Sequence, residues 1–349
     1  MENNRLTQSR LTLPVATLYA ELHDLSEADQ AGSRREGGFS SKRINGKTYW
    51  YRQVWIGHTR HQKSIGPETR ELLDWMEQER EKTALWQQQR RRRRELCHAL
   101  KAGLKMNFDA LSGRVIARLS DRGVFERGAV LIGTHAYMTY GPMLGHRLPA
   151  MAVTTQDIDI AAEATIALAS AEAAIPFAGI IEETDPAFFI VPPHPGARLS
   201  HALKYKGGEA RVELLMPAEP GREWQPKFIP HLAFGAQGIP YLDYLLKAPV
   251  RATYLHDDGI SVMVPQPARF ALHKLIVAAN RDVGAQAKAR KDVAQAASLI
   301  TILSEDREDD LREAADDLAS YPAIYAGQAR KGVRQLADAV RAMLPENLR

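Results

Sequence analysis

The spacing of apolar residues divides the chain into three blocks, and the first block predicts a small antiparallel sheet. Asn45-Gly46 is a strong hairpin signal, because both central residues of a type I′ turn need a positive φ. Around it, aromatic and basic side chains alternate with the period of a strand, as in the run from Tyr49 to Trp55. We expect three strands within residues 42–66, followed by one long helix from Glu68 to about Met106.

The middle block alternates between strand and helix patterns, which predicts an α/β (α+β) fold with a mixed sheet. A helix is expected at residues 110–123, then a short apolar strand at 128–133 that ends in glycine and leads into a second helix. A strand at 155–160 precedes a helix at 162–174. Further strands are expected at 188–191, 199–205 and 211–216, the last two joined by a turn at 206–209.

The third block predicts a C-terminal helical bundle. Pro267 begins a helix, and the pattern continues at residues 288–303, 307–319 and 328–343. We therefore expect a basic N-terminal region at residues 1–106, a central domain at 107–264 and a helical domain at 265–349.

Composition excludes several classes of protein. The chain has 349 residues, 45% of them hydrophobic and 25% charged, as in globular proteins of two or three domains. A single cysteine, Cys97, excludes a disulfide framework and a cysteine-based zinc cluster. No run approaches the ~20 apolar residues of a membrane helix, and the N-terminus lacks the apolar core of a signal peptide. We expect a cytoplasmic protein with no membrane contact.

Charge is unevenly distributed, although the net charge is only +4. Residues 34–66 contain eight Lys or Arg against one acid, and residues 90–94 are five consecutive arginines. Because five residues cover more than one helical turn, these arginines cannot share one binding face. Residues 305–317 carry eight acids against two arginines. The chain therefore has a basic N-terminal part and an acidic patch near its C-terminus.

Candidate chemistry lies in the middle block. Asp157 and Asp159 alternate along a strand, so both carboxylates project from one face and repel each other unless a cation binds. Gly133-Thr134 stands at a strand-to-helix junction, where backbone N–H groups favour a phosphate; a tight turn is the alternative. Glu213, in an apolar strand, is either a third metal carboxylate or the partner of Arg211 in a salt bridge.

In this order, the motifs resemble the nucleotidyltransferase fold of the DNA polymerase β superfamily. The resemblance rests on VLIGTHAYMTYGPMLG, TTQDIDIA, VELLMP and PARFALHKLIVAANR, and it extends to toxin and abortive-infection nucleotidyltransferases. It implies an Mg²⁺-dependent transfer of NMP from an NTP to a hydroxyl of RNA or protein, in a toxin or phage-defence setting with an antitoxin as a further partner. The resemblance implies a two-ion metal centre on three acids, Asp157, Asp159 and Glu213. It also implies a set of phosphate-binding residues, which are Gly133, Thr134, His135, Lys274 and Arg281. Lys291-Asp292 would link two helices.

The basic sheet suggests a nucleic-acid contact through four cations. These are Arg43, Lys47, Arg52 and Arg60. Trp50 and Trp55 beside them offer stacking faces, although aromatic residues of a small sheet also serve to pack on a neighbouring helix. The second function class is accordingly a non-catalytic nucleic-acid-binding protein that retains the nucleotidyltransferase fold.

Overall fold

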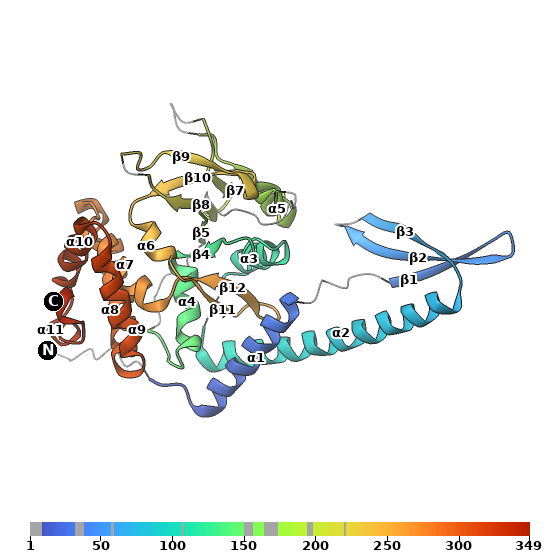
Figure 1. Cartoon of the computed structure of the whole chain (residues 1–349), viewed down its shortest axis with the longest axis horizontal. Coiled ribbons are helices and arrows are strands. Elements are labelled where there is room, and N and C mark those ends of the chain that lie inside the picture. Colours follow the sequence, from blue (N-terminus) through green and yellow to red (C-terminus); the bar gives the residue numbers. More distant parts are fainter. Residues whose placement is uncertain are drawn as a thin grey trace.

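The structure is a computed structural model that describes residues 9–31, 38–56, 59–106, 108–149, 156–163, 174–193, 198–219 and 221–349. It confirms the mixed α/β class, with a small N-terminal sheet, a central mixed sheet and a helical C-terminal part (Figure 1). Within these ranges, no helix combines the length and the apolar character needed to cross a membrane.

The N-terminal elements match the alternation of the sequence. After helix α1 (Leu13–Ala31), strands β1 (Gly38–Ile44), β2 (Lys47–Ile56) and β3 (Thr59–Pro67) form an antiparallel sheet in chain order. Asn45 and Gly46 have φ values of 50° and 79°, which confirms the left-handed turn of the first hairpin. Helix α2 (Arg70–Leu104) begins where the Leu72 N–H donates to the Thr69 hydroxyl.

Helix α2 has two different halves. Its last turns are packed in the main body, where Leu96, Cys97, Leu100 and Leu104 are buried. The first turns extend away from the body and carry the three-stranded sheet at their far end (Figure 1). A helix of 35 residues is about 50 Å long, so its first turns hold this sheet away from the central sheet.

The arginine run lies where α2 enters the main body. Arg90 and Arg93 both donate to Asp258, at 2.9 and 2.7 Å, and Arg94 pairs with the adjacent Asp257. Arg92 pairs with Glu21 of α1. The prediction that these arginines share no single face is confirmed, and four of the five hold α2 against neighbouring elements.

The central sheet is mixed. Its strand order is β4-β5-β8-β10-β9, with β5, β8 and β10 parallel, while β7 pairs with the first residues of β8 and β6 with β7. The strands are β4 (Val130–Leu131), β5 (Asp157–Ala161), β6 (Phe188–Ile190), β7 (Ala202–Tyr205), β8 (Arg211–Pro217), β9 (Pro226–Ile229) and β10 (Phe234–Ile239). Helices α3 (Ala110–Asp121), α4 (Gly133–Met143) and α5 (Phe177–Thr184) accompany them. Most of the helix expected at residues 162–174 lies outside the described residues.

The remaining elements are a short helix, a hairpin and the C-terminal bundle. Helix α6 (Leu242–Leu246) and the antiparallel pair β11 (Val250–Tyr254) and β12 (Ile260–Val264) lead into the helices. The bundle comprises α7 (Pro267–Ala279), α8 (Gln286–Asp306), α9 (Glu308–Ser320), α10 (Ala323–Val333) and α11 (Asp338–Arg341). The single helix expected at residues 328–343 is divided, because Ala337 is extended with ψ of 146°.

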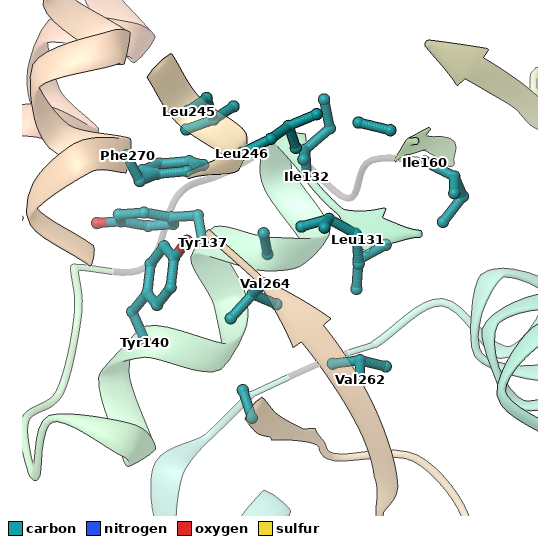
Figure 2. Close-up of a cluster of buried hydrophobic side chains, with 14 of the residues drawn as sticks. Leu131, Ile132, Tyr137, Tyr140, Ile160, Leu245, Leu246, Val262, Val264 and Phe270 are labelled. Carbon is teal, nitrogen blue, oxygen red and sulfur yellow. The ribbon is translucent and has the colours of Figure 1, made fainter. Parts of the chain in front are cut away.

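One apolar cluster joins the sheet to the bundle (Figure 2). In this cluster, side chains from α4, α6 and α7 meet strand and junction residues, namely Leu131, Ile132, Ile160, Val262 and Val264. Phe270 of α7 contacts two rings of α4, Tyr137 at 6.3 Å and Tyr140 edge-on at 5.1 Å between ring centroids. This core fixes the junction of β4 and α4 beside β5, which is where the candidate chemistry lies.

Candidate active site

Three carboxylates project from one face of the central sheet. In the parallel pair of β5 and β8, Asp157 is opposite Arg211 and Asp159 is opposite Glu213. The intervening Ile158 and Ile160 are buried on the other face. Adjacent strands lie about 4.8 Å apart, so Asp159 and Glu213 are immediate neighbours.

Asp159 also lies against the first residue of helix α4. Gly133 has φ of +67°, and a Cβ at this position would overlap the Asp159 carboxylate. The Ile132 N–H donates to the Asp159 carbonyl at 2.9 Å, which holds the two segments in register. Since the first N–H groups of a helix have no intrahelical acceptor and carry partial positive charge, anion-binding groups stand beside the carboxylates.

The clustered negative charge affects Asp159 most. Burial, and then the charge of Glu213, raises the pKa of Asp159 to about 6, while the nearby Lys274 ammonium opposes this. A carboxylate among other carboxylates is stabilised by a bound cation. The electrostatics therefore fit a cation at this position.

Two lysines from the helical bundle complete the surroundings. Lys291 of α8 donates to the Thr134 hydroxyl at 3.0 Å, and burial, then the Lys274 charge, lowers the Lys291 pKa. Lys274 of α7 and Arg281, which follows that helix, both bind Asp292 of α8, at 2.8 and 3.0 Å. Asp292 thus links α7 to α8. While Lys274 is paired with Asp292, its charge also lowers the pKa of Asp159.

Glu213 is already paired. Arg211 contacts its carboxylate at 2.5 Å and His201 Nε2 lies 3.9 Å away, so the salt bridge considered from the sequence is formed. Among the described side chains, no group of three or more His, Cys, Asp or Glu is arranged to hold a metal ion. Mg²⁺ commonly takes one or two carboxylates plus substrate phosphates. Asp157 and Asp159 fit that donor set.

His135 lies apart from these groups. Its side chain is only 1% exposed, and its Nδ1 is 2.9 Å from the Tyr254 hydroxyl. Burial lowers the His135 pKa to about 4, so the imidazole is neutral. His135 can therefore offer a phosphate its backbone N–H, whereas its ring belongs to the core.

A cavity of about 410 Å³ lies beside Glu213 on the side toward β10, opposite the side that faces Asp159 on β5. Sequence analysis did not predict this cavity. Its walls include His201, Glu213, Leu215, Trp224, Gln237 and Ile239. Trp224 is 62% exposed, and its backbone N–H donates to the Gly238 carbonyl at 2.9 Å. A tryptophan among the polar residues of 219–227 was the one available signal.

The predicted nucleic-acid residues lie elsewhere. Arg43, Lys47 and Arg52 belong to the sheet at the far end of α2, away from β5 (Figure 1). The side chain of Arg60 lies outside the described residues.

Comparison with known proteins assigns the central part of the chain. A family model described as nucleotidyltransferase matches residues 110–320, which is more than half of the chain. The chain belongs to this nucleotidyltransferase family. No curated protein matches the chain, and no solved structure does. Every candidate residue from Gly133 to Asp292 lies within the matched range, and the family supports nucleotidyl transfer with a nucleotide substrate. The N-terminal sheet precedes the match.

Proposed function

We propose that this nucleotidyltransferase transfers a nucleoside monophosphate from an NTP to a hydroxyl, with Mg²⁺ held by Asp157 and Asp159. One observation carries the proposal: Asp159 lies against Gly133, so a carboxylate pair and a helix N-terminus meet at one point. A triphosphate is the ligand that needs both, because it takes N–H donors on its oxygens and a divalent cation between them.

The triphosphate would bind at the start of α4. The N–H groups of Gly133, Thr134 and His135 are the first of that helix, so they have no intrahelical acceptor and would donate to such an anion. Lys291 already contacts the Thr134 hydroxyl and would neutralise a phosphate beside it. Lys274 is held by Asp292 close enough to Asp159 to influence its pKa. Together these groups would hold the triphosphate beside the carboxylates of Asp157 and Asp159.

When bound, Mg²⁺ supplies charge neutralisation and Lewis-acid polarisation of phosphate oxygens. Asp157 and Asp159 would hold it, and Glu213 would contribute to a second ion only after leaving Arg211. In the reaction, the acceptor oxygen bonds to the α-phosphorus and the bond from the α-phosphorus to the bridging oxygen breaks, so pyrophosphate leaves. Once released from Arg211, Glu213 would also take the hydroxyl proton.

The acceptor would occupy the cavity between Glu213 and Trp224. The nucleotide groups lie on the β5 side of Glu213 and this cavity lies on the β10 side, so Glu213 stands between the two substrates. Trp224 offers an exposed ring for a flat group of the acceptor. An RNA end and a protein hydroxyl are both acceptors of this type.

The test is transfer of label from each α-³²P NTP to total RNA or to lysate protein, with Mg²⁺. We expect label from one or more α-³²P NTPs, none from the γ-³²P form, and none with Asp157→Asn or Asp159→Asn. In parallel, NTP with Mg²⁺ should raise the melting temperature of the wild type but not of Asp157→Asn. If neither transfer nor a thermal shift is observed, the result favours the non-catalytic protein instead.

A further inference from the structure

The N-terminal sheet is strongly basic. Residues 38–67 include six Lys or Arg and no Asp or Glu. The first acid after them, Glu68, accepts a hydrogen bond from Trp50 Nε1 at 2.9 Å. Such a segment is complementary in charge to a polyanion.

Strand register divides the side chains of this sheet into two faces. Directly paired residues of an antiparallel sheet lie on the same face, so the pairs Phe39–Arg52 and Arg43–Thr48 share one face. The pairs Ser40–Tyr51, Lys42–Tyr49 and Ile44–Lys47 share the other. The Lys42 ammonium lies 5.0 Å from the Tyr51 ring centroid, and Gln62 donates to Ser40, as residues of one face must.

The first of these faces is the one that contacts α2. The Phe39 ring meets Trp75 of α2 edge-on, with ring centroids 5.6 Å apart. Trp50, which pairs with Ser41 on this face, is bound to Glu68 just before the helix. These contacts support the packing alternative for Trp50, and they place Arg43 and Arg52 on the same side as α2.

The second face is defined by Lys42, Lys47, Tyr49 and Tyr51, and we call it the open face. We propose that the open face binds single-stranded nucleic acid. The two tyrosines offer rings for stacking, and the two lysines, both exposed, lie beside them for the phosphates. Tyr49 and Tyr51 are two residues apart on one strand, about 6.5–7 Å, so each ring serves a separate unstacked base, which a duplex does not present.

The position of the sheet suits this role. It lies over the first turns of α2, apart from the central sheet (Figure 1), so a polymer bound to it would lie outside the candidate active site. Binding here is independent of the proposed transfer, and goes beyond it, because no residue of the open face belongs to the candidate active site.

The experiment measures fluorescence anisotropy of a labelled single-stranded oligonucleotide of about 20 nucleotides, RNA or DNA, with full-length protein. Salt is varied between about 50 and 200 mM. Two double variants each remove two cations, Lys42→Ala with Lys47→Ala from the open face and Arg43→Ala with Arg52→Ala from the α2 face. Tyr49→Ala with Tyr51→Ala removes both rings, and the matching Phe variant retains them. Melting temperatures of all variants are compared.

The proposal expects the lysine variant to bind more weakly than the arginine variant. The slope of log affinity against log salt concentration should also be shallower by about 1.4 for the lysine variant, since each of two lost single-strand contacts contributes about 0.7. The Ala variant of the tyrosines should bind at least about tenfold more weakly, whereas the Phe variant retains affinity. Absence of binding would overturn the proposal. So would equal losses for the lysine and arginine variants, equal affinity for a duplex, or a loss explained by a lower melting temperature.

Discussion

Lys291 and Thr134, which are 157 residues apart in the chain, are joined by a hydrogen bond of 3.0 Å between the ammonium and the hydroxyl. This bond brings helix α8 to the first turn of α4, where the triphosphate is proposed to bind. Replacing Lys291 by Met should raise the Kd for NTP roughly tenfold or more, because a charged hydrogen bond is worth about 1.5–3 kcal/mol. Calorimetry measures this directly. Lys288→Met, which removes an exposed charge from the same helix, should leave the Kd unchanged; equal effects would remove Lys291 from the site.

Gly133→Ala tests the close approach of α4 to β5. An L-residue is strained at φ of +67°, and the new Cβ would overlap the Asp159 carboxylate. We expect the free energy of unfolding to fall by about 1–3 kcal/mol in urea titrations, with loss of NTP binding. Gly284→Ala is the matched control, since nothing lies within 4 Å of a Cβ there and its φ is not in the left-handed region. A neutral Gly133→Ala variant would contradict this geometry.

Asp159 makes stability depend on pH in the absence of metal. Its pKa of about 6 in the folded state lies above the ordinary value of 3.8. The folded state therefore binds the proton more tightly, and the stability that this contributes is full below pH about 4 and is lost as the pH rises through about 6. Asp159→Asn should be stabilised relative to the wild type at pH 8, on the order of 1–3 kcal/mol, with a smaller difference at pH 4.

Thermal melts in chelator at both pH values measure this difference. Asp309→Asn serves as the control, because Asp309 is a 94% exposed aspartate of α9. A difference between Asp159→Asn and the wild type that does not change with pH would contradict the assigned charge cluster.

Arg93 should contribute far more to the free energy of unfolding than Arg91, another member of the arginine run. It is 5% exposed and bound to Asp258 at 2.7 Å, so Arg93→Ala should cost roughly 3 kcal/mol by leaving buried charge uncompensated. Arg91 is exposed, and Arg91→Ala should change the free energy of unfolding by less than about 0.5 kcal/mol. Chemical denaturation of both variants checks this. Equal values would mean that the run does not anchor α2.

Local signals predicted much of the fold. Short-range periodicity and turn chemistry predicted the Asn45-Gly46 hairpin, a long helix from Glu68, and the strand bearing Asp157 and Asp159. All three elements are confirmed, and the helix begins at Arg70. Strand β10 was missed because Gly235 and Gly238 lower its strand character. Gly235 is required there because a Cβ would overlap the Ser200 carbonyl, a contact with a distant segment that spacing does not reveal.

The site was predictable only where its residues lie on adjacent strands or junctions. Asp159 and Glu213 come together because parallel register is set by the hydrophobic pattern of β5 and β8. The Lys291–Thr134 contact depends on how α7 and α8 pack, which no local pattern specifies. The superfamily, the domain boundaries, the acceptor and a toxin or defence setting stay predictions.

Trp224 provides the test that distinguishes the two sides of Glu213. Its exposed ring borders the cavity assigned to the acceptor, while the nucleotide groups lie across Glu213 on β5 and α4. Trp224→Ala should therefore raise the KM for the acceptor roughly tenfold, the loss expected when a stacking ring is removed. Trp224→Phe, which keeps a ring, should recover most of that loss. The Kd for NTP should be unchanged in both variants, because no group proposed to bind the triphosphate is altered. If instead the Kd for NTP rises and the KM for the acceptor does not, the cavity holds the nucleotide, and the roles of the two sides must be exchanged.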